Sequence, residues 1–226
     1  MKKRLFIIIT LFVFIFTSCS LKSMVKSELR NAKAANITFI HKNPKVGDYA
    51  VWDISPTNEA ADYSQGNARY VHKIVEVGVD FVKIETKGDI NTMMGRSSLS
   101  DFIYYTTCDR NGNVKKLEIV DSKDGDTISQ DIAVKGDENF WEEINISDPI
   151  ISMFIEEYGI STSVFYNNKT YNGIYRAFRF LNDSSDNFVY MLYIVDDSVN
   201  FSVLKSYTIN LDNEGILYKT AESILI

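Results

Sequence analysis

The sequence predicts a mainly β domain of the α+β kind: an antiparallel meander sheet, curved into a half-barrel or a barrel, with one short helix packed on it. Two features of residues 37–226 lead to this prediction. Short runs rich in Val, Ile, Tyr, Phe and Thr alternate with turns of Asn, Asp, Gly and Ser about every ten residues, which is typical of antiparallel meanders. A single stretch, residues 148–159, combines helical spacing with capping residues at both ends.

Four strands are expected in the first part of this domain, at residues 38–40, 49–54, 69–77 and 81–87. In the third of these runs, Val71, Val75 and Val77 are expected on one face, with charged residues opposite. His72 is then expected on the polar face, as a surface residue. Such alternation is typical of a sheet with one solvated side.

A hairpin and one further strand are expected next. Residues 102–108 and 114–120 flank an Asn-Gly turn at 109–113, and Asn-Gly between two β runs is the strongest local hairpin signal. Residues 127–134 follow as a short strand. Cys108, at the end of the first run, has no cation or His beside it in the sequence, so it is expected to be a buried or half-buried strand residue.

The expected helix has a clear start and end. Asp148 can cap its N-terminus, Pro149 suits the first helical position, and Gly159 suits the residue just after the end. Because a helix this short is marginal alone, it is expected to lie on an apolar face of the sheet. One stripe would make that contact: Ile150, Ile151, Phe154, Ile155 and Tyr158.

The last part of the domain is expected to be β again, at residues 163–166, 174–181, 188–195, 201–211 and 216–223. Turns rich in Asn, Asp, Ser and Gly separate these runs. Together with the earlier runs they predict a single antiparallel domain over residues 37–226, which is long enough to bury a sizeable core.

The N-terminal residues have the pattern of a secretory signal peptide, or leader. Lys2, Lys3 and Arg4 precede the apolar run 5–16, and small residues follow it, which is the order of a signal peptide. The run is about half the ~20 residues that a membrane-spanning helix needs. The sequence therefore predicts a signal peptide over residues 1–18 in place of a transmembrane anchor.

The end of this leader, Phe16-Thr17-Ser18-Cys19, resembles the lipobox of bacterial lipoproteins. The resemblance implies that Cys19 receives a diacylglycerol thioether, becomes the mature N-terminus and carries acyl chains such as palmitate. The alternative is an ordinary cleaved signal peptide with an incidental cysteine. If Cys19 is acylated, the protein is extracytoplasmic and held at the cell membrane or outer membrane, because two or more chains anchor stably. Ser20 carries no Asp-type retention signal, which favours the outer membrane.

Residues 19–36 are expected to be a tether or a short amphipathic helix. Lys22, Lys26, Arg30 and Lys33 fall on one stripe, which would suit an anionic headgroup layer. Packing of the apolar stripe on the domain, or a flexible linker, would explain the same pattern.

The charge of the mature chain limits its partners. Removal of the leader takes away three of the 24 basic residues and none of the 30 acidic ones, which leaves a formal net charge of −9. An acidic body is a poor nucleic-acid binder, since phosphates need cations. An anionic lipid surface is also expected to repel it. Apart from Cys19 only Cys108 remains, so no intramolecular disulfide is expected.

No catalytic, metal or cofactor motif is recognisable. The two histidines, His41 and His72, stand without a partner motif, and there is no Gly-x-Ser-x-Gly, Ser-x-x-Lys, His-Glu-x-x-His or Cys-x-x-Cys. The acidic turns 121–126 and 210–215 lack the terminal Glu of an EF-hand. We therefore expect no enzyme, no metal and no cofactor.

Two functions compete at this point. The first is a membrane-anchored cell-envelope lipoprotein that acts as a binding or structural module for an envelope protein, a glycan or the wall. The second is a lipid or lipoprotein carrier or acceptor, because a curved antiparallel sheet with a helix is similar in outline to the LolA/LolB type. A carrier needs an apolar cavity, although the same residues would serve as a solid core: Trp52, Val71, Tyr104, Phe154, Phe178 and Tyr190.

Overall fold

The computed structural model describes residues 37–56, 68–88, 102–121, 125, 127–131, 141–182, 187–211 and 217–226. All of them belong to one compact unit, Ala35–Ile226. The leader, Cys19 and the segment 19–36 lie outside the described residues, so the expectations about them stay predictions.

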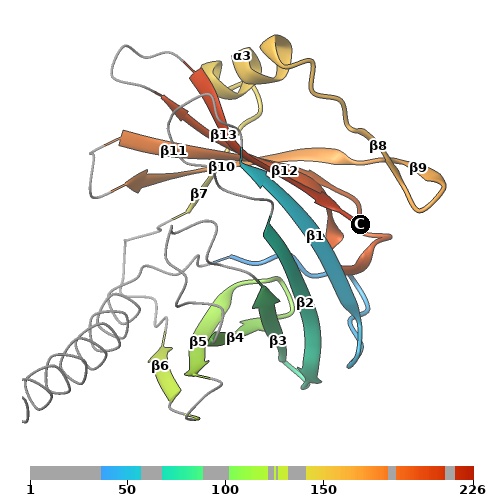
Figure 1. Cartoon of the computed structure of the whole chain (residues 1–226), viewed down its shortest axis with the longest axis vertical. Coiled ribbons are helices and arrows are strands. Elements are labelled where there is room, and N and C mark those ends of the chain that lie inside the picture. Colours follow the sequence, from blue (N-terminus) through green and yellow to red (C-terminus); the bar gives the residue numbers. More distant parts are fainter. Residues whose placement is uncertain are drawn as a thin grey trace, which may run out of the picture. The chain divides into compact units, whose positions relative to one another are not determined.

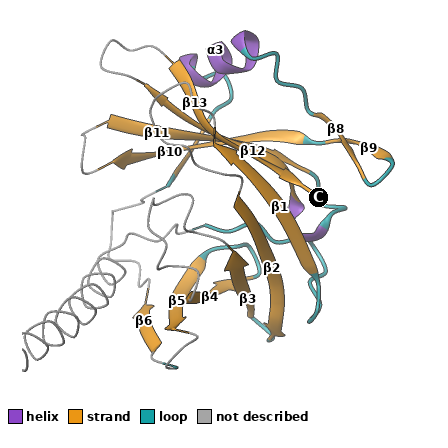
Figure 2. Ribbon diagram, in the orientation of Figure 1, coloured by secondary structure: helices purple, strands orange, loops and turns teal. Residues whose placement is uncertain are grey.

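Most of the described chain forms one antiparallel sheet of eleven strands (Figure 1, Figure 2). Its order is β6-β5-β4-β3-β2-β1-β13-β12-β11-β10-β7, and the separate hairpin β8-β9 projects beside it. The sheet is not closed, because β6 and β7 are its two edges. The strands are β1 Tyr49–Pro56, β2 Ala68–Val77, β3 Phe81–Gly88, β4 Phe102–Asp109, β5 Val114–Asp121, β6 Thr127–Asp131, β7 Glu142–Ile144, β8 Ser163–Tyr166, β9 Lys169–Asn172, β10 Ile174–Asn182, β11 Asn187–Val195, β12 Val203–Leu211 and β13 Leu217–Leu225.

The predicted fold class is confirmed: a curved antiparallel sheet with one short helix in the described chain. Most expected strands lie where the alternation placed them. The expected strand 38–40 is wrong, since only Ile37 makes an isolated bridge, to Asn113. Two short strands, β7 and β9, were not predicted. The expected strand 201–211 begins two residues later, after a 3₁₀ turn at Asn200–Ser202.

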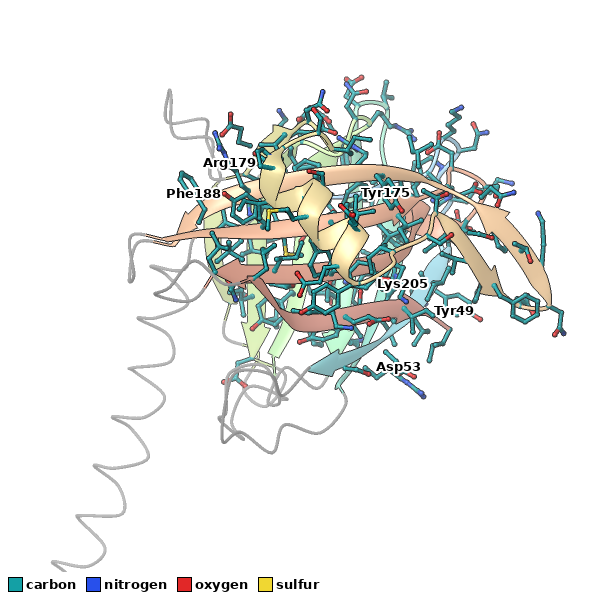
Figure 3. All side chains as sticks on the ribbon, turned by 90° about the horizontal axis from the view of Figure 1, so that it is seen from above. Tyr49, Asp53, Tyr175, Arg179, Phe188 and Lys205 are labelled. Carbon is teal, nitrogen blue, oxygen red and sulfur yellow. The ribbon has the colours of Figure 1, made fainter. Side chains whose placement is uncertain are left out.

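Helix α3, Pro149–Glu157, forms as the capping residues predict. An Asp148 carboxylate oxygen accepts the N–H of Ile150 at 3.0 Å, and Gly159 follows the helix with a φ of 58°. Ile151 and Phe154 are fully buried, and the Phe154 ring lies 5.7 Å from that of Tyr207 on β12. The helix therefore packs on the C-terminal strands of the sheet (Figure 3). No helix in the described ranges is both long and apolar enough to cross a membrane.

Cross-strand pairing divides the sheet into an inner and an outer face. Paired residues point to the same side, so His72, Thr86 and Tyr104 share the inner face through neighbouring strands. The inner face continues through Ser206 and Ser223 on β12 and β13. The outer face of strands β2–β5 carries the charged residues Lys73, Glu85 and Glu118, with Tyr105 paired between the two glutamates. On the C-terminal strands, α3 packs on the outer face through buried side chains such as Phe154, whose ring lies next to that of Tyr207.

The side chains in the first part of β2 point to the opposite faces of the sheet from those expected. Its pairing with β3 slips by one residue between Ile74 and Glu76, which is a β-bulge. Before the bulge, the inner face holds Tyr70, His72 and Ile74, while Val71 pairs with Val51 on the outer face. After it, Val77 turns inward opposite Val82. The expectation of one valine face, with His72 at the surface, is therefore wrong.

Candidate functional site

A cavity of about 460 Å³ lies on the inner face. Both halves of the sheet contribute to it, from β1–β5 on one side and β11–β13 on the other, which requires the sheet to curl around it. Aromatic rings and hydroxyl groups dominate the lining: Ile37, Thr38, Phe39, Trp52, Tyr70, His72, Thr86, Tyr104, Thr106, Leu117, Tyr193, Phe201, Val203, Ser206 and Ser223.

The segment 37–41 closes part of the open side. The Thr38 N–H donates to the Gly112 carbonyl at 2.8 Å, in the β4–β5 turn. One residue later, the Phe39 ring lies 4.6 Å from the Tyr193 ring on β11. The Arg176 guanidinium stands 5.2 Å from the Phe39 ring centroid and pairs with Glu143 through two hydrogen bonds of 2.7 and 2.8 Å. The segment thus joins the N-terminal strands to the C-terminal ones across the cavity.

Three rings form an edge-to-face cluster in the wall. The ring centroids of Trp52 and His72 lie 4.7 Å apart, those of His72 and Phe201 5.6 Å, and those of Trp52 and Phe201 5.9 Å. Each interplanar angle is 71° or more. The indole N–H of Trp52 donates to the Val203 carbonyl at 3.3 Å, so Trp52 is held by its polar atom as well as by its ring.

Phe201 reaches this cluster from an unusual backbone conformation. Its φ is 61° and that of Ser202 is 55°, and the left-handed region is uncommon for a bulky residue. The Phe201 N–H donates to Nδ1 of His41 at 3.1 Å, and the Asn200 side chain donates to the Tyr49 carbonyl at 3.0 Å. These contacts hold the turn so that the Phe201 ring points at the cavity.

His72 has no hydrogen-bond partner in the part of the chain that the structure describes. Burial lowers the pKa of its imidazole from 6.5 to about 4, so the ring is neutral at pH 7. A neutral imidazole has one N–H donor and one acceptor nitrogen. Buried polar groups are normally paired, so an unpaired one at the wall of a cavity marks a place where a ligand or water can bind.

The remaining polar groups of the cavity are also uncharged. The Ser206 and Ser223 hydroxyls bond each other at 2.6 Å. Burial raises the pKa of the phenols of Tyr104 and Tyr193, so both keep their protons at neutral pH. No Asp, Glu, Lys or Arg occurs among the described residues of the lining. The described part of the lining is therefore polar in places but carries no formal charge.

This arrangement is suited to binding more than to proton-transfer chemistry. A general base needs an orienting partner and a pKa near the working pH, and His72 has neither within the described residues. Cys108, buried on β4, has its pKa raised to about 12 by burial and by the nearby Asp109. No His, Cys, Asp and Glu cluster able to hold a metal ion occurs in the described ranges.

Two of the six candidate cavity residues, Trp52 and Tyr104, line the cavity. Phe178 lies on the same face but is packed behind it, with its ring 6.0 Å from Phe39 and 5.7 Å from Tyr193. Val71 is on the outer face of β2. Phe154 and Tyr190 lie on the outer side of the C-terminal strands, the former in α3.

The sequence reasoning missed His72, Tyr193 and Phe201. The alternation of Tyr70, His72 and Ile74 against Arg69 and Lys73 was a signal for the first of these, because charges mark the solvated side. No local pattern indicates the other two: Tyr193 reaches the cavity through the pairing of β11 with β12, and Phe201 through the turn that His41 and Tyr49 hold.

A second hollow of about 360 Å³ lies on the outer face between the end of α3, β8 and β12. Lys205, which is seen beside the helix in Figure 3, and Lys219 both form ion pairs with Glu222. The Tyr175 hydroxyl donates to the Ile160 carbonyl at 2.6 Å. Because these polar groups satisfy one another, this hollow is a weaker candidate for a binding site.

Comparison with known proteins adds little. No protein-family model and no curated protein matches the chain. Among solved structures, the hypothetical protein CT021 from Chlamydia trachomatis is similar at 12% sequence identity, over 79% of this chain and 87% of that one, with a TM-score of 0.31. A likeness that weak carries no argument about function.

Proposed function

We propose that this chain is a lipid-anchored binding protein of the cell envelope, and that its β domain takes a small ligand into the inner cavity. The observation that carries the binding role is the cavity itself, with an unpaired His72 in its wall. Its volume lies within the range of about 300–1,000 Å³ that is usual for ligand sites, and such sites combine apolar walls with a few polar groups.

The anchoring role rests on the leader. The lipobox-like Phe16-Thr17-Ser18-Cys19 supports acylation at Cys19, and the formal charge of −9 on the mature chain supports a body that stands off the lipid surface. The protein would then work on the extracytoplasmic side of the cell membrane or outer membrane, with the bilayer as its first partner.

Substitution of Cys19 tests the anchor. We expect the wild type to incorporate labelled palmitate and to fractionate with membranes, and Cys19→Ala to incorporate none and to leave the membrane fraction. Membrane retention of Cys19→Ala, together with an unlabelled wild type, would contradict the proposal.

A matched pair of variants tests the binding role. Thr106 lines the cavity, while the adjacent Thr107 pairs with Lys83 and Lys116 on the outer face of the same strand. Residues 20–226 contain the whole compact unit, so the leaderless protein is the one to test. Native mass spectrometry should detect a co-purified small molecule in this protein and in Thr107→Phe, and none in Thr106→Phe. Equal occupancy in both variants would count against the cavity.

The same cavity supports the carrier hypothesis as a second candidate, because an apolar pocket that opens to solvent can hand a lipid from one site to another. The two roles differ in kinetics. A carrier moves a fluorescent lipid between vesicle populations faster than the lipid moves alone, whereas a binding module only sequesters it. The transfer rate in the presence of residues 20–226 distinguishes them.

A further inference from the structure

We propose that the ligand of the inner cavity is an uncharged, largely apolar molecule with a hydroxyl head group that hydrogen-bonds to His72. This inference rests on the proposed binding role and names the chemistry that the cavity selects.

The first argument is the distribution of charge. The outer face of strands β2–β5 carries ion pairs such as Lys83–Glu118, whose atoms are 2.7 Å apart. The inner face of the same strands contributes only aromatic, aliphatic, hydroxyl and imidazole groups to the cavity. A carboxylate or an ammonium group placed among these side chains would give up part of its water and find no opposite charge in the described lining, which is unfavourable. An uncharged ligand avoids that penalty.

The second argument is the position of His72. Among the described residues its nitrogens have no partner, and its ring contacts are with two other rings, those of Trp52 and Phe201. The Ser206 and Ser223 hydroxyls, by contrast, already bond each other. A hydroxyl can donate to the acceptor nitrogen of a neutral imidazole or accept from its N–H, so it satisfies either orientation of the ring. Because two neighbouring rings fix its position and its neutral ring offers both a donor and an acceptor, His72 is the anchor for the head group.

The third argument is the character of the walls around that anchor. The rings of Trp52 and Phe201 lie beside His72, and the rings of Phe39 and Tyr193 line the same cavity. Aromatic walls bury apolar surface and impose no exact length or branching on the occupant. They fit an alkyl or ring-shaped body, which needs few polar partners beyond its head group.

The test compares four probes of one length: 1-octanol, octane, octanoate and octylammonium. The protein is residues 20–226 with Trp141→Phe, so that fluorescence reports from Trp52 in the cavity wall. At pH 7.5 we expect 1-octanol to bind at least about fivefold more tightly than each of the other three, which is the factor expected for one buried hydrogen bond.

Variants of His72 separate the anchor from the walls. His72→Phe keeps a ring but removes both nitrogens, so the affinity for 1-octanol should fall to the affinity for octane. His72→Gln keeps a donor and an acceptor and should retain most of the preference for 1-octanol. Tyr105→Phe removes a hydroxyl from the outer face, where it donates to Glu85, and should leave binding unchanged. Near-ultraviolet circular dichroism checks that each variant is folded.

The outcomes distinguish this inference from the proposed function. If no probe changes the Trp52 fluorescence or binds by calorimetry, the cavity is not a binding site and the proposed function fails. If octane or octanoate binds as tightly as 1-octanol, or if His72→Phe keeps the preference for the alcohol, the cavity binds ligands but the assigned chemistry is overturned.

Discussion

The backbone N–H of Phe201 donates to Nδ1 of His41 at 3.1 Å, although 160 residues separate the two in the chain. On the other side of the ring, Nε2 lies 3.0 Å from a carboxylate oxygen of Asp48, which also accepts the N–H of Lys45 at 2.7 Å. With Nδ1 as acceptor, the ring proton belongs on Nε2 and is donated to Asp48. His41 thus fixes a left-handed residue that forms a wall of the cavity, which is a structural role for a histidine without a catalytic motif.

Replacement of His41 tests this role. His41→Ala leaves the Phe201 N–H without its acceptor, and we expect a loss of about 1–3 kcal/mol in the free energy of unfolding. The Oδ1 of asparagine can occupy the place of Nδ1, so the free energy of unfolding should decrease clearly less in His41→Asn than in His41→Ala. Urea denaturation measures both. Equal losses in the two variants would mean that the bond to Phe201 contributes nothing.

Helix α3 offers a second test, on the outer side of the sheet. Asp148→Ala removes the oxygen that accepts the Ile150 N–H, and we expect a loss of about 1 kcal/mol in the free energy of unfolding. Asp148→Asn keeps an accepting oxygen and should stay close to the wild type. A loss of equal size in Asp148→Asn would assign the effect to the charge of Asp148 instead of its hydrogen bond.

The fold could be predicted because its signals are local. Alternation and turn residues act over a few positions, and the caps of α3 lie within twelve residues of each other, from Asp148 to Gly159. Strand β7 has only three residues, and its pairing with Ala177, Phe178 and Arg179 depends on a strand far along the chain. No local pattern could have indicated it.

The site was predicted only in part, for the same reason. Trp52 and Tyr104 sit on regular strands, where period-two alternation places them correctly. The bulge at Val75 breaks that period in β2, so a count of alternating residues assigns Val71 and His72 to the wrong faces. The contact of Phe39 with Tyr193 joins residues that nothing in the sequence relates.

The rate at which a thiol reagent labels Cys108 reports how often the whole domain unfolds. Its side chain is fully buried, its Sγ donates to the Val82 carbonyl at 3.4 Å, and its pKa is raised to about 12, so almost no thiolate exists at pH 8. In residues 20–226 we expect a disulfide reagent to label Cys108 only as fast as the protein unfolds. A cysteine placed at the exposed position Thr170 in β9 (Thr170→Cys) should react at least about a hundredfold faster. Similar rates at the two sites would contradict the burial of Cys108.

The pH dependence of stability tests the environment of His72. Burial lowers the pKa of His72 to about 4 in the folded protein, while the unfolded chain keeps the ordinary value of 6.5. Between these values the unfolded state binds more protons, so the free energy of unfolding decreases as the pH falls through this window. Relative to His72→Phe, which cannot titrate, the wild type should lose about 2 kcal/mol between pH 7 and pH 5, at about 1.4 kcal/mol per pH unit below 6.5. Other groups titrate alike in both proteins, so the difference between their urea denaturation curves isolates His72. Parallel profiles would mean that the ring is solvated when the protein is folded, and that the cavity wall is open to water at this position.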